Sequence, residues 1–220
     1  MIDGIEDRMR SRVLRESAAV AMEEWADFLD RLDVPFFNYR GSHVIEVVRI
    51  AKFLARETGA DYDVVVMAAW FHDIAKPSTV GGDGTHHSES AIIACEYLLN
   101  EGLEPMFVER VCDAIEKHDG LTQDEVLTPL EAQIVWESDK LSKLGLTGLL
   151  FNLFNGLRYE PNCGIKEILE SRIRGSYALV AETAASMKTE PARRLAEEKM
   201  RNHDSVIRIL EAELRIADMP

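Results

Sequence analysis

The apolar residues of this chain recur mainly at intervals of three and four, which is the spacing that buries one face of a helix. Such stretches, separated by proline, glycine and polar residues, predict helices at about 12–32, 38–58, 62–73, 87–98, 105–118, 129–144, 146–157, 165–187 and 191–216. We find no convincing alternation of the kind that predicts a half-buried strand. The pattern therefore predicts an all-α fold, a single-domain bundle of about eight or nine helices.

One predicted helix has an informative end. The segment 62–71 is rich in valine and alanine and could be a buried strand, but its length of about ten residues favours a helix. Pro77 disfavours helical geometry at the residue before it, so we expect this helix to end near residues 73–75. At a fraying last turn, the side chains of His72 and Asp73 can both turn toward one ion.

Between this helix and the next, residues 76–85 contain Pro77 and three glycines. A segment of this length and composition predicts a loop that acts as a lid or rim rather than a tight connection. The two long helices at the end of the chain are predicted to form either a homodimer interface or a lid over the core, and their apolar stripes do not separate these alternatives.

Composition narrows the class of protein. The chain has 220 residues, of which 46% are apolar and 29% charged, and it contains no evident boundary, so one domain over residues 1–220 is expected. The formal net charge of −14 disfavours broad binding to nucleic acid or to anionic membranes. The N-terminus lacks the apolar core of a signal peptide, and no apolar run approaches the roughly 20 residues of a membrane span, which favours the cytoplasm.

The cysteines fit the same compartment. Cys95, Cys112 and Cys163 are odd in number and contain no Cys-x-x-Cys pair. They are therefore interpreted as separate thiols in a reducing environment.

Four residues are candidate metal ligands: His43, His72, Asp73 and Asp139. His43 heads an inward stripe with the spacing i, i+4, i+7, i+11 that continues through Val47, Ile50 and Leu54. Asp139 lies at the edge of the apolar face of its own helix. Imidazole and carboxylate together suit Mn, Fe, Ni, Zn or Mg with bound water.

Each candidate also has a simpler interpretation. An inward histidine is more often a core residue with one hydrogen-bond partner, and His203 passes the same stripe test as His43. Asp139 could be exposed and paired with Lys143, although ionised carboxylates are rarely fully buried without a partner or a metal. A basic residue such as Lys76, just past a helix end, can simply complement the helix dipole.

The order His…His-Asp…Asp resembles the HD-domain superfamily of metal-dependent phosphohydrolases, and in particular its small bacterial-type hydrolases. Four further segments are similar to motifs of that family, namely residues 72–76, 87–91, 115–118 and 136–145. The resemblance implies an HD-like core at about 38–148 and leaves a C-terminal helical extension at about 163–217. Ser142 and Glu137 stand where many relatives of the subgroup have aspartate, so the resemblance implies no particular substrate.

The resemblance also implies roles for individual residues. His43, His72, Asp73 and Asp139 would bind one divalent ion (Mn, Mg, Fe, Ni, Co or Zn), and Asp73 could accept a proton from water. Three further residues would neutralise phosphate charge or protonate the leaving oxygen, namely Lys76, His87 and His118.

The expected activity is hydrolysis of a phosphate ester or anhydride in a nucleotide or another small phosphorylated metabolite. Two alternatives stay open. One is a di-iron oxygenase, which some members of the same superfamily are. The other is a non-catalytic sensor that binds a nucleotide and signals through the C-terminal helices.

Overall fold

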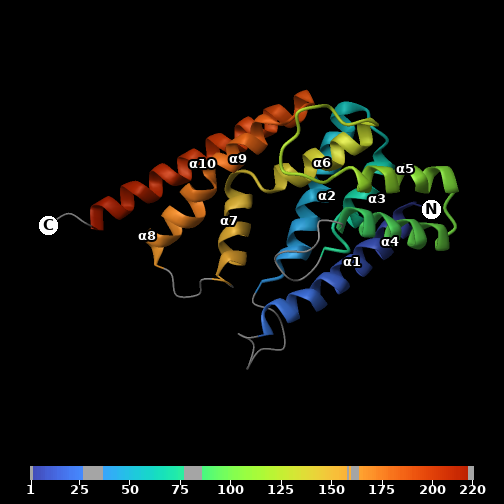
Figure 1. The fold of residues 1–220 in the computed structure, drawn as a ribbon, viewed down its shortest axis with the longest axis horizontal. Helices are drawn as coiled ribbons and strands as arrows, with labels where there is room; N and C mark the ends of the chain where they lie inside the picture. Colours follow the sequence, from blue (N-terminus) through green and yellow to red (C-terminus); the bar gives the residue numbers. More distant parts are fainter. Residues whose placement is uncertain (1, 27–36, 77–85, 158, 160–163, 218–220) are drawn as a thin grey trace. The chain divides into compact units, whose positions relative to one another are not determined.

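The computed structural model describes residues 2–26, 37–76, 86–157, 159 and 164–217. Within these residues the chain is helical and has no strand, which confirms the predicted all-α class (Figure 1). The chain divides into two compact units, one of residues 1–120 and 125–139, the other of residues 121–124 and 140–220. The expected single domain with an HD-like core and a C-terminal extension stays a prediction.

The first unit is built around its most buried helix. Its helices are α1 (Ile2–Glu24), α2 (Tyr39–Thr58), α3 (Tyr62–Phe71), α4 (His86–Asn100), α5 (Pro105–Glu116) and α6 (Leu130–Ser142), the last of which continues into the second unit. Helix α3 is buried from Val64 to Phe71, and α1, α2 and α5 pack around it. Figure 1 shows α4 and α5 side by side as a hairpin. A helix that is apolar on all sides belongs at the centre of such a core.

Helix α1 begins ten residues earlier than the pattern predicts, at Ile2 rather than near residue 12. Ile5, Met9 and Val13 are buried at intervals of four, so the apolar stripe extends to the start of the helix. The many charged residues between them lie on the outer face, and their density obscured the stripe in the sequence. The predicted continuation of this helix through residues 27–32 lies outside the described residues.

Local signals set the ends of the two helices that carry the candidate ligands. The Asn38 side chain accepts a hydrogen bond from the Gly41 backbone N–H at the start of α2. Gly59 ends α2 with a φ of 74°, a left-handed geometry that favours glycine. At the start of α3, the Asp61 carboxylate accepts hydrogen bonds from the backbone N–H groups of Asp63 and Val64.

The second unit contains α7 (Gly145–Gly156), α8 (Ile165–Ile168), η2 (Leu169–Arg174), α9 (Gly175–Ala185) and α10 (Glu190–Ala217). The continuous helix predicted at 165–187 is interrupted by η2, a π-helical segment that apolar periodicity alone does not distinguish from α-helix. In the core of the second unit, α7 and η2 pack against the apolar stripe of α10. The residues of this core are Leu149, Leu169, Ile173, Val206, Ile207, Leu210 and Leu214.

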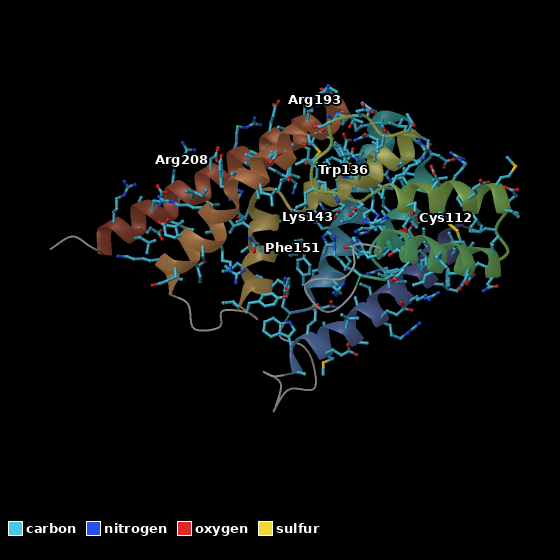
Figure 2. All side chains as sticks on the ribbon, viewed as in Figure 1. Cys112, Trp136, Lys143, Phe151, Arg193 and Arg208 are labelled. Carbon is cyan, nitrogen blue, oxygen red and sulfur yellow. A yellow bond between two sulfur atoms is a disulfide. The ribbon has the colours of Figure 1, made fainter. Side chains whose placement is uncertain are left out.

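The structure corrects the interpretation of the cysteines. Cys95 of α4 and Cys112 of α5 form a disulfide with their Cα atoms 6.0 Å apart, and Cys112 is labelled in Figure 2. The two residues are 17 positions apart in sequence, and only the packing of α4 against α5 brings them together. Cys163 and the expected loop beyond Lys76 lie outside the described residues. Across the described parts of the chain, none of the helices has the length and apolarity needed to cross a membrane.

Candidate metal centre

The four candidate ligands converge in the first unit from three helical segments. His43 lies on α2, His72 and Asp73 occupy the turn that follows α3, and Asp139 lies on α6. The side chains of His43, His72 and Asp139 are no more than 3% exposed, and that of Asp73 is 7% exposed. Two carboxylates so deeply buried require compensation by cations, hydrogen bonds or a metal.

The donor atoms of these residues face one another. His43 Nε2 lies 3.2 Å from Asp139 Oδ1 and 3.6 Å from Asp73 Oδ2. His72 Nε2 lies 3.3 Å from His43 Nε2, 3.6 Å from Asp73 Oδ2 and 3.9 Å from Asp139 Oδ1. Ligands about 2.1 Å from a common ion stand roughly 3.0–3.4 Å apart. The spacing of His43, His72 and Asp73 is close to this, and these three residues form one group of potential metal ligands.

His72 presents a lone pair to this cluster. Its Nδ1–H donates to the Ala69 carbonyl at 2.8 Å, which leaves Nε2 as the acceptor nitrogen. Burial lowers the pKa of His72 to about 3, although the carboxylates of Asp73 and Asp139 act to raise it. The imidazole is therefore neutral near pH 7, as a metal ligand must be.

Asp73 is ionised, and its two carboxylate oxygens face two different groups of side-chain nitrogen atoms. Burial acts to raise the pKa of Asp73, but the Lys76 ammonium, 2.9 Å from Oδ2, and His72 hold that pKa well below its ordinary value. Its other oxygen, Oδ1, is buried without a hydrogen-bond partner in the described chain, while Nε2 of His86 and Nε2 of His118 each lie 3.5 Å away. A cation would compensate this oxygen, so the donor set fits a divalent ion.

His118 is held in the same manner as His72. Its Nδ1–H donates to the Ile115 carbonyl at 2.6 Å, and the residue is 1% exposed. With its Nδ1 occupied, Nε2 is the nitrogen that points at Asp73. His118 is therefore buried beside the cluster, as its inward spacing in the sequence predicts.

Sequence reasoning missed His86. The apolar stripe of the following helix selected His87 instead, yet Asp73, His86 and His118 form a second group of potential ligands. The His87 ring centroid lies 5.7 Å from that of His86 and 6.5 Å from that of His118, and His87 joins a third group with His86 and Asp119. Helix α4 begins at His86, so both histidines belong to its first turn, where a stripe defined farther along the helix is a poor guide.

The turn that carries His72 and Asp73 is fixed from both sides. Arg40 of α2 donates from Nη1 to the Lys76 carbonyl at 2.9 Å, and the Ala75 N–H donates to Ser90 Oγ of α4 at 3.1 Å. These bonds, together with the packing of α3, keep Lys76 next to Asp73. Lys76, the predicted phosphate-binding cation, thus lies beside Asp73, a predicted metal ligand. The functional roles of these residues remain predictions.

Comparison with known proteins shows which family part of the chain is similar to. Residues 40–144 match the family model of the HD domain, the family that the sequence motifs resemble. No curated protein sequence matches the chain significantly.

Solved structures show the same fold. Bacillus subtilis YpgQ, solved in complex with ADP, is 21% identical with a TM-score of 0.68, and the match covers 94% of this chain and 97% of YpgQ. A predicted HD-superfamily hydrolase from an uncultured Thermotogales bacterium is 23% identical with a TM-score of 0.55, covering 91% and 92%. An HD-superfamily hydrolase from Bacillus thuringiensis is 16% identical with a TM-score of 0.60, covering 94% and 98%.

Proposed function

We propose that this protein is a metal-dependent phosphohydrolase that acts on a nucleotide or another small phosphorylated metabolite. The observation that carries the proposal is that the Nε2 atoms of His43 and His72 lie 3.3 Å apart and that each lies 3.2–3.9 Å from one oxygen of Asp73 and one oxygen of Asp139. The match to the HD-domain family model and the fold shared with an HD-superfamily hydrolase support the class of reaction. The ADP bound in YpgQ supports a nucleotide as the first class of substrate to test.

In this proposal, His43, His72, Asp73 and Asp139 hold a divalent ion such as Mn, Mg, Fe, Ni, Co or Zn. When bound, such an ion would supply Lewis-acid chemistry toward the phosphoryl group and the attacking water. Phosphoryl transfer otherwise depends mainly on positioning and charge stabilisation, which the protein side chains provide.

The remaining polar residues have complementary tasks. The Lys76 ammonium neutralises phosphate charge, and burial of that group is offset by Asp73, which raises the pKa of Lys76 and keeps it charged. His118 accepts or donates a proton at Nε2, since its Nδ1 is engaged by Ile115. His86 and His87 extend the same wall of the site, where they can contact phosphate oxygens.

A screen of phosphate release tests the proposal. Wild-type protein loaded with Mn, Mg, Co or Ni is offered nucleoside mono-, di- and triphosphates, and released phosphate and pyrophosphate are measured. We expect turnover of at least one substrate that chelation abolishes and metal restores. Asp73→Asn should lose this turnover, whereas Asp113→Asn, the same change in a surface carboxylate that pairs with Lys117, should keep it. A blank screen on protein shown to contain metal would reject the proposal and, if nucleotide binds, favour a sensor.

A di-iron oxygenase is the second candidate, because Asp73 faces ligand groups on both sides, with His43 and His72 on one and His86 and His118 on the other. If two ions were bound, a carboxylate in this position would be available to both of them as a ligand. Two irons per chain with oxygen consumption, and no phosphate release, would favour this function over the first.

A further inference from the structure

The hairpin of α4 and α5 is cross-linked by the disulfide between Cys95 and Cys112, which lies outside the candidate metal centre (Figure 2). Residues 101–104 close one end of the hairpin, and the disulfide joins the two helices partway along their length. It connects residues 17 positions apart in sequence, whose Cα atoms lie 6.0 Å apart. The cross-link therefore fixes how α4 and α5 lie against each other between the turn and the open end.

The open end of the hairpin carries two histidines of the candidate centre. His86 is the first residue of α4, nine positions before Cys95, and His118 follows α5, six positions after Cys112. Nε2 of each histidine lies 3.5 Å from Asp73 Oδ1. A change in the packing of α4 against α5 would therefore change the distance between the two imidazoles, or the distance of one of them from Asp73.

The two cysteines differ in their exposure to solvent. Cys112 is buried, at 9% exposure, whereas Cys95 is partly exposed. Ile92, one turn before Cys95 on α4, is 58% exposed, and Glu96, which follows it, is also exposed. A small thiolate can therefore approach the disulfide from the Cys95 side. Disulfides that are exposed to solvent exchange with thiols more readily than fully buried ones.

The hairpin is also held by contacts other than the disulfide. Both helices bury apolar side chains in the first unit, namely Ala91, Ala94 and Leu98 of α4 and Val108, Val111 and Ile115 of α5. This burial does not require the cross-link, so we expect the reduced chain to stay folded. At the open end, Ser88 Oγ donates an exposed hydrogen bond to Glu116. Such a bond contributes little in water, so the disulfide is the stronger of these two direct links between the helices.

We propose that Cys95 and Cys112 form a reversible thiol–disulfide pair that exchanges with small thiols and disulfides, and that its state is transmitted along α4 and α5 to His86 and His118. In the reduction, a small thiolate attacks Cys95 Sγ, and the Cys112 sulfur leaves with the electron pair of the Sγ–Sγ bond and takes up a proton. A second small thiolate then attacks the sulfur of the first, which frees Cys95 as a thiol and releases a small disulfide. Oxidation is the reverse, with a small disulfide as the oxidant.

Counting of free thiols tests the pair itself. The metal-free chain is equilibrated with glutathione disulfide or with excess reduced glutathione, labelled with N-ethylmaleimide under denaturing conditions and weighed by mass spectrometry. The matched control Cys163→Ser removes the remaining cysteine. We expect two labels on this variant after reduction, and no label and no bound glutathione after oxidation, with wild type carrying one label more after reduction. Two labels or bound glutathione on the oxidised variant, or no label on the reduced one, would overturn the proposal.

NMR of the histidine rings tests the coupling on the same metal-free protein, without a measurement of turnover. We expect reduction to shift the ring resonances of His86 and His118 and to leave those of His203, in the second unit, unchanged. The variants His86→Gln and His118→Gln assign the two signals. Unchanged resonances of His86 and His118, or a reduced chain that circular dichroism shows to be unfolded, would overturn the proposal. The proposed hydrolysis is judged separately, by the screen of phosphate release.

Discussion

At the scale of single residues, Asp73 connects the two halves of the candidate centre. Its Oδ2 faces His43, His72 and Lys76, and its Oδ1 faces His86 and His118. The carboxylate stays ionised in a buried position because surrounding polar groups outweigh the cost of desolvation. Removal of this one charge should therefore affect metal binding more than removal of any surface carboxylate.

Asp73→Ala is expected to abolish tight binding of the divalent ion, since it deletes a charged ligand shared by the cluster. Metal content is measured by mass spectrometry after dialysis, with Asp113→Asn as the control. Wild type should also gain thermal stability on addition of Mn, because an ion that binds only the folded state stabilises it, by about 2.7 kcal/mol at a free concentration of 100 Kd. Folded Asp73→Ala with a full complement of metal would refute the ligand assignment.

His118→Ala is expected to retain the ion held by His43, His72, Asp73 and Asp139 yet to lower turnover by roughly 10²- to 10⁴-fold, the effect of losing a general acid or base. Steady-state kinetics and metal analysis of the same preparation measure both quantities. If wild type contains two ions and the variant one, His118 is instead a ligand of a second ion.

At the scale of elements, α2 and α10 each carry a histidine at an inward position, His43 and His203, but the residues around the two histidines differ. Helix α2 starts at a side-chain cap and delivers His43 one turn later. Helix α10 carries His203, which passed the same inward-stripe test as His43 and is indeed buried, at 3% exposure. The structure places His203 against the ring of Tyr177 in the second unit, and among the described residues His203 belongs to no group of potential metal ligands. Inward spacing in the sequence therefore predicts that a histidine is buried, whereas the residues that surround it decide whether it can take part in a metal site.

Loss of the α2 cap should be measurable. Asn38→Ala removes the acceptor for the Gly41 N–H and the donor to Ser17 Oγ, and should lower the free energy of unfolding by about 1 kcal/mol. Asn38→Asp keeps the capping oxygen and should lose less. Urea unfolding followed by tryptophan fluorescence compares the three proteins, and identical midpoints would show that the cap adds nothing to stability.

Burial of His203 predicts a dependence of stability on pH. Desolvation lowers the pKa of His203 below its ordinary 6.5, although Asp204 acts to raise it. The unfolded chain then binds this proton more readily than the folded chain, so the free energy of unfolding should fall as pH drops through about 6.5. His203→Leu should show a smaller difference in urea midpoint between pH 8 and pH 5.5. An equal difference in variant and wild type would assign the pH dependence to other groups.

At the scale of the whole molecule, the C-terminal helices raise the question of self-association. Several apolar side chains on them are exposed, including Ile165, Leu179 and Ile209, at 59%, 46% and 58%. Exposed apolar residues on neighbouring helices are a common feature of protein interfaces. Of the two roles that the sequence predicts for these helices, a homodimer interface or a lid over the core, the first can be measured directly.

We expect the full chain to sediment as a dimer at micromolar concentration, and the double variant Leu179→Glu, Ile209→Glu to sediment as a monomer because two buried charges would oppose the interface. Both positions are exposed in the chain itself, so the variant should fold, as circular dichroism can check. A wild-type chain that stays monomeric at all concentrations would contradict the prediction.

The sequence by itself determined the all-α class, most helix boundaries and the inward positions of His43, His72 and His118, because these follow from local periodicity and end signals within one helix. The placement of His72 and Asp73 side by side at a helix end likewise follows from the local sequence. Only the tertiary structure decided that His86 faces Asp73 and that Cys95 joins Cys112. Each of these depends on how separate helices pack, and the periodicity of one helix carries no information about the rotation and position of its neighbour.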